Sequence, residues 1–95
     1  MLSAYQQLAY TLLPERQLHY DDTLATLEKC RANGNAKLCF SAQQAVGFAL
    51  RALNTTREAA GLAPVAGPPM RGLDELLAHG RACEAQRQRL SRLAA

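Results

Sequence analysis

The sequence predicts an all-α protein: a small bundle of three to four helices with a long central helix and a Pro/Gly-rich linker before the last helix. The 95 residues include 18 alanines and 16 leucines but only two valines and no isoleucine. Such apolar residues favour helices over strands. Apolar positions also recur at three- and four-residue spacing, with Gly, Pro and Asn clustered between the periodic stretches. At this length we expect one helical domain over residues 1–95.

The first two helical stretches are expected within residues 2–32. Ser3 is a suitable N-cap for the first, which runs to about residue 13. Pro14 either ends this helix or begins the next one. The Asn33-Gly34-Asn35 turn ends the second stretch, because Gly and Asn tolerate the left-handed conformation of a helix C-cap. The predicted inner face of the second stretch consists of Leu18, Leu24, Leu27 and Cys30.

Residues 35–60 are predicted to form the longest and central helix, which Gly61 ends. Its expected inner seam consists of Leu38, Ala42, Ala45, Ala49 and Ala52. Phe40 and Phe48 lie on other sectors, so this helix is apolar over much of its circumference. A break near Asn54 is an alternative, because the spacing of Thr55 and Glu58 fits a capping box.

The segment 62–72 holds three of the four prolines, which predicts a linker with polyproline character. Its apolar residues suggest that it lies against the helices. The last helix is expected over residues 73–93. The residues predicted to point inward from it are Leu73, Leu76, Leu77, Cys83 and Leu90.

Composition limits the cellular context and the kinds of partner. The net charge of +3 permits an acidic partner without requiring one. No apolar run approaches the roughly 18–20 residues that span a membrane, and no signal peptide is visible. The three cysteines form no C-x-x-C pair, which is typical of free thiols in a reducing compartment. We therefore expect a cytoplasmic protein without membrane contact.

No motif indicates catalysis, a cofactor or a metal. The alternative to free cysteines is a tetrahedral zinc site assembled from Cys30, Cys39, His79 and Cys83. The cysteines lack the usual short ligand spacing, and Cys30 and Cys83 fall on apolar stripes, where cysteine packs as a small hydrophobe. His19 and His79 lie near carboxylates, but no recognised nucleophile motif accompanies them. The sequence predicts a non-enzymatic protein with no catalytic residue, metal or cofactor.

The surplus of apolar helix surface predicts a protein that acts by protein–protein binding, as an adaptor, regulator or inhibitor. A domain this small has little to bury on its own, and surplus apolar surface is typical of an interface. The expected partner is a second copy, in a dimer, or another protein. The residues predicted at the interface are Tyr5, Tyr10, Tyr20, Phe40 and Phe48.

The alternative is a nucleic-acid- or nucleotide-binding protein. Residues 81–92 carry four arginines, interleaved with glutamines, against Glu84 alone. A helix face of this kind can contact phosphates and base edges. The residues that would make this contact are Arg81, Arg87, Arg89 and Arg92.

The stretch KLCFSAQQAVGFALRAL, residues 37–53, resembles the second-helix signature of the HEPN superfamily of helical bundles. Ala42-Gln43-Gln44-Ala45 and Arg51-Ala52-Leu53 occupy the places of its A-Q-Q-A core and following basic and apolar residues. Residues 72–77, GLDELL, resemble a later H-D-L-x-x-L-L element. The R-x-x-x-x-H motif of the ribonucleases in this superfamily is missing, and Gly47 stands where Glu is common. The resemblance, over about a third of the chain, implies a bundle fold and a non-catalytic relative that binds nucleotide, nucleic acid or protein.

Overall fold

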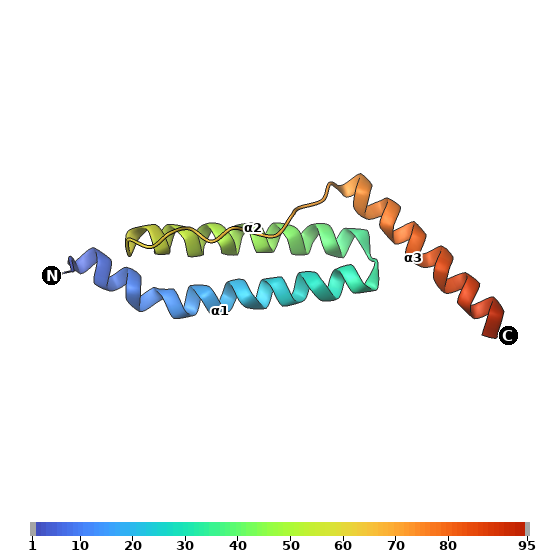
Figure 1. The fold of residues 1–95 in the computed structure, drawn as a ribbon, viewed down its shortest axis with the longest axis horizontal. Coiled ribbons are helices and arrows are strands. Elements are labelled where there is room, and N and C mark those ends of the chain that lie inside the picture. Colours follow the sequence, from blue (N-terminus) through green and yellow to red (C-terminus); the bar gives the residue numbers. More distant parts are fainter. Residues whose placement is uncertain (1, 95) are drawn as a thin grey trace.

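The computed structural model describes residues 2–94, which form three helices and no strand. They are α1 (Ala4–Asn33), α2 (Ala36–Ala59) and α3 (Leu73–Ala94). Helices α1 and α2 run antiparallel as a hairpin, and α3 leaves from the hairpin's turn end at an angle (Figure 1). The all-α prediction is confirmed. Helix α2 contacts both of the other helices, so it is central in that sense, but α1 is the longest helix.

Helix α1 joins the two stretches that the sequence separated at Pro14. Ser3 is its N-cap: the Ser3 hydroxyl accepts from the Gln6 N–H and the Gln6 side chain accepts from the Ser3 N–H, both at 3.1 Å. This reciprocal capping box fixes the start of the helix. Pro14 lies inside the helix, where it lacks the N–H of a regular turn. The first part of α1 bends away from the direction of the rest, as expected at an internal proline (Figure 1).

The ends of the hairpin follow the sequence signals closely. Gly34 has a φ of 70° and its N–H donates to the Arg31 carbonyl, which ends α1 in the left-handed cap predicted there. Asn35 then caps α2, its side chain accepting from the Leu38 N–H. At the other end Gly61 has a φ of 80°, in a Schellman motif that lets the next N–H return to the Arg57 carbonyl at 2.8 Å. No break interrupts α2 at Asn54.

The core lies between α1 and α2 and is thin. Its buried members are Tyr20, Leu27, Ala42, Val46, Ala49 and Leu53. Three positions predicted for the inner seams are instead exposed, namely Leu18, Leu38 and Ala45. The periodicity identified the apolar stripes, but each stripe is wider than the single neighbouring helix can cover.

The molecule is strongly elongated. Its extents are 69 × 24 × 16 Å and its radius of gyration is 18.5 Å, whereas a compact domain of this length has about 12 Å. Its accessible surface is 6808 Å², and a compact monomer of 10.3 kDa exposes about 5,400 Å². The chain therefore exposes about 1,400 Å² more than a compact protein of its mass.

Helix α3 crosses the turn of the hairpin instead of packing along it. Leu76 is its one buried residue among those described, and Arg87 Nη2 donates to the Asn33 carbonyl at 2.7 Å. Gly80 lies so close to the turn that a Cβ there would be 2.7 Å from the Gly34 carbonyl oxygen. The expected inward orientation of Leu73, Leu77 and Leu90 is not observed, because these side chains have no helix to cover them and are exposed.

Candidate protein-binding surface

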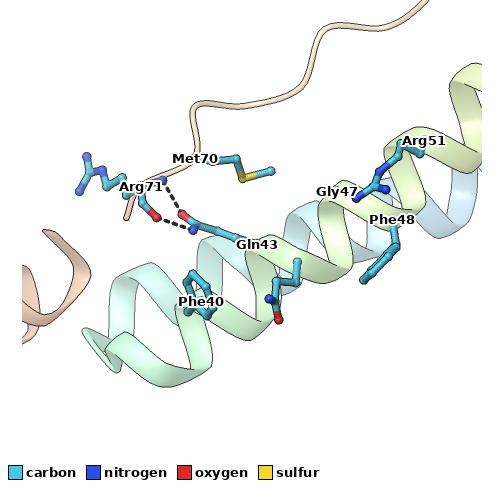
Figure 2. A pocket seen from close by; sticks show the side chains of 8 residues that line it. Phe40, Gln43, Gly47, Phe48, Arg51, Met70 and Arg71 are labelled. Carbon is cyan, nitrogen blue, oxygen red and sulfur yellow. Dashed lines mark hydrogen bonds between the residues drawn. The ribbon is translucent and has the colours of Figure 1, made fainter. Parts of the chain in front are cut away.

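An apolar patch covers the side of α2 that faces away from α1. We call it the outer patch and define it by Phe40, Gln44, Gly47, Phe48, Arg51 and Met70. On α2 its positions lie roughly opposite the buried seam, as expected from 100° per residue. A shallow groove of about 330 Å³ runs between these side chains. Phe48 is 65% exposed and Phe40 36% exposed, so two aromatic rings are available on one helix face (Figure 2).

One wall of the groove is built by the segment between α2 and α3, which returns along α2 (Figure 1). The buried Gln43 amide donates to the Arg71 carbonyl at 2.8 Å and accepts from the Arg71 N–H at 3.0 Å (Figure 2). Asn54, eleven residues on, makes the same pair of bonds with Val65, at 3.0 and 2.8 Å. The eleven-residue helical separation between Gln43 and Asn54 corresponds to about 16 Å along α2. This length is close to what the six residue steps from position 65 to position 71 span in an extended conformation. The two amides therefore clamp the segment at both ends.

Further contacts hold this segment to the hairpin. Arg57 Nε donates to the Ala63 carbonyl at 2.6 Å, and an Arg31 guanidinium nitrogen donates to the Pro69 carbonyl at 2.9 Å. A Cβ on Gly67 would lie 2.6 Å from a methyl group of Leu50, so a larger residue there would require the Leu50 side chain to move. Because the segment is held in this way, the Met70 side chain has a defined place beside the groove (Figure 2).

The polar side chains that line the groove are amides and guanidinium groups, from Gln43, Gln44, Arg51 and Arg71. The guanidinium carbon of Arg51 lies 5.1 Å from the centre of the Phe48 ring, a cation–π contact that leaves the ring exposed. A Cβ on Gly47 would meet nothing within 4 Å. The groove is lined by no carboxylate, imidazole or thiol. Its chemistry therefore suits contact with apolar or aromatic groups, not proton transfer.

The structure separates the three tyrosines predicted at the interface. Tyr5 and Tyr10 are exposed on α1, and neither of them lines the groove of the outer patch. Tyr20 is 4% exposed and belongs to the core cluster that includes Ala42 and Ala49. It is therefore not available at the surface. The sequence did not indicate the roles of Gln43 and Asn54, because single amides on a helix carry no pattern.

The arginines of α3 have different surroundings. Arg87 faces the hairpin, bonds the Asn33 carbonyl and lies 3.9 Å from Glu84 in an exposed ion pair. Arg81, Arg89 and Arg92 are exposed, and within residues 2–94 none of them makes a side-chain hydrogen bond or ion pair. Three of the four predicted nucleic-acid contacts are thus free to bind a ligand.

The cysteines and His79 lie near the hairpin turn without forming a ligand set. Over the described residues 2–94, no three His, Cys, Asp or Glu side chains are placed to hold a metal ion. Cys83 Sγ lies 3.5 Å from His79 Nε2, one helical turn away. Burial raises the pKa of the Cys39 thiol, and the nearby Cys30 raises it further. Cys39 is also only 2% exposed, so burial limits both its thiolate form and the access of reagents to it.

Comparison with known proteins gives no relative: no protein-family model, curated protein or solved structure matches the chain. The HEPN-like resemblance stays a prediction. Among residues 2–94, none of the helices combines the length and apolar character that crossing a bilayer requires.

Proposed function

We propose that this chain is a non-enzymatic interaction protein, an adaptor, regulator or inhibitor, that binds another protein surface through the outer patch. The observation that carries the proposal is the pair of exposed rings, Phe40 and Phe48, beside a groove whose wall is clamped in place. Aromatic side chains contribute most strongly to interfaces when a pocket receives them. The clamps at Gln43 and Asn54 keep the groove formed before binding, which lowers the entropy lost on association.

A photo-crosslinking amino acid at position 48 tests this proposal in cells that express the protein. We expect covalent adducts with a protein, either a second copy or another chain. The matched control is the same amino acid at Leu18, which is 62% exposed but lies on α1. Adducts at position 48 that are absent at position 18 support the proposal. No adduct at position 48, or equal adducts at both positions, would overturn it.

The second candidate function is binding of nucleic acid through α3. It is favoured by the exposure of Arg81, Arg89 and Arg92 and by their lack of partners within residues 2–94. Replacing all three by Ala should abolish the binding of a labelled oligonucleotide, and the affinity of the unchanged protein should fall steeply with salt. Changing Phe48 should leave this binding intact. Absence of binding at low salt refutes this candidate.

A further inference from the structure

We infer that the outer patch is the contact between two copies of this chain, which pair antiparallel through α2 about a two-fold axis at Gln44. The inference rests on the proposed function and names the occupant of its site. It depends on the surface that the single chain leaves uncovered, on the shape of the patch and on the spacing of its aromatic residues.

The excess surface of the whole chain is comparable in size to the area that a stable dimer buries. The chain exposes about 1,400 Å² beyond a compact protein of its mass. Interfaces of standard size bury about 800 Å² per partner, and obligate homodimers bury about 1,000–2,500 Å² per chain. A contact between two copies that buried an area of this size would leave each chain with the exposed surface of a compact protein of its mass.

The outer patch is self-complementary, which a two-fold contact requires. It carries both a projecting ring, Phe48, and the groove between Phe40 and Met70 that could receive a ring. Gly47 adds no side chain at this level of the helix, and a Cβ there would meet nothing in the single chain. Its hydrogen therefore leaves space on the surface where a second helix can approach closely.

The spacing of the rings determines the register. Phe40 and Phe48 lie four residues before and four residues after Gln44, on the i±4 ridge along which helices commonly pack. In an antiparallel pair with Gln44 at the axis, each Phe40 lies opposite Phe48 of the second copy. The two Gln44 amides meet each other, and each can donate and accept a hydrogen bond.

The charges of the patch predict how salt acts. Each chain carries +3. Arg51 belongs to the patch, and exposed Lys37 lies on α2 three residues before Phe40. In this register Lys37 lies toward Arg51 of the second copy, so like charges oppose association. Added salt screens this repulsion, and we expect the dissociation constant to fall as salt rises. A partner of negative charge would show the opposite dependence.

Sedimentation equilibrium of the purified full chain tests the inference. We expect twice the chain mass of 10.3 kDa at micromolar concentration, and tighter association in higher salt. Phe48→Glu should raise the dissociation constant at least tenfold while the helical circular dichroism is kept. Leu18→Glu is the matched control, because Leu18 is almost equally exposed and should leave the dimer unchanged. A monomer throughout the micromolar range, or a dimer broken by Leu18→Glu and not by Phe48→Glu, would overturn the inference.

Cysteine crosslinking tests the register. Under mild oxidation Gln44→Cys should give a covalent dimer well above the level of the unchanged protein, because a residue on the axis meets its own copy. Thr55→Cys, exposed on the same helix eleven residues away, should give no such increase. Crosslinking through position 55 and not 44 refutes the proposed axis. A monomeric chain that still gives adducts with another protein from position 48 refutes self-association and leaves the proposed function standing.

Discussion

Gly80→Ala should destabilise this protein, although the same change in most exposed helices is stabilising. Alanine in a helix interior is favoured over glycine by about 0.5–1 kcal/mol, because glycine loses more backbone entropy on folding. At Gly80, however, the new Cβ would lie 2.7 Å from the Gly34 carbonyl oxygen. A carbon normally approaches such an oxygen no closer than about 3.3 Å.

The shortfall of about 0.6 Å must be met by moving α3, because the opposing atom is backbone. This movement would disturb the contacts that hold α3 at the turn. Leu76 is buried there, and the Arg87 bond to the Asn33 carbonyl is the one interhelical side-chain bond of α3 found in residues 2–94. Overpacking of this kind costs about 1–3 kcal/mol. It should therefore outweigh the gain in helix propensity and release α3 from the turn.

Gly47→Ala is the matched comparison, because a Cβ at Gly47 meets nothing within 4 Å. Both changes are made in the Phe48→Glu background, so that association at the outer patch does not affect the comparison. Urea unfolding should show Gly47→Ala stabilised by about 0.5–1 kcal/mol and Gly80→Ala destabilised. Release of α3 should also make Cys83, which packs against Gly34, react faster with a thiol reagent. A more stable Gly80→Ala with unchanged Cys83 reactivity would refute the reasoning.

Three further changes test the hairpin. Ala49→Glu buries an unpaired carboxylate in the core and should unfold the chain by circular dichroism, whereas Ala45→Glu, at an exposed position, should be tolerated. Asn54→Ala removes both bonds to residue 65 and should lower the free energy of unfolding by about 1–3 kcal/mol in urea titrations. The pKa of Cys39 is raised in the folded state, so the folded protein favours the neutral thiol. The free energy of unfolding should therefore fall as the pH rises past the ordinary thiol pKa, and this fall should be smaller in Cys39→Ala.

Local signals in the sequence predicted most of the elements. The cap at Ser3 and the turn at Gly34 act within a few residues of backbone, so composition and spacing are enough to place them. The helix boundary predicted at Pro14 was wrong, because α1 continues through this residue. A proline inside a helix removes one backbone hydrogen bond and bends the helix, and packing of the flanking turns against α2 can compensate for this loss. The helix boundaries predicted at 35–60 and 73–93 agree with the structure to within one or two residues.

Coverage of the apolar faces could not be read from the sequence. Periodicity shows that a face is apolar but not whether another element covers it, so exposed Leu18 and Leu90 looked the same as buried Leu27. Asn54 shows a second limit. Its neighbours suggested a helix break, and only the path of the following segment reveals that its amide pairs with the backbone of Val65.

The path of that segment also bears on the surplus face of α2. A loose linker rich in proline could spread over the exposed rings and make a partner unnecessary. Gln43 and Asn54 prevent this, because they lie three helical turns apart on one flank of α2. Each of their amides forms hydrogen bonds with both the N–H and the C=O of one residue of the segment. The segment is thus confined to the flank, where Val65 packs near Leu50 and the core. Phe48 remains uncovered by the chain itself, which is the physical reason to expect a partner at the outer patch.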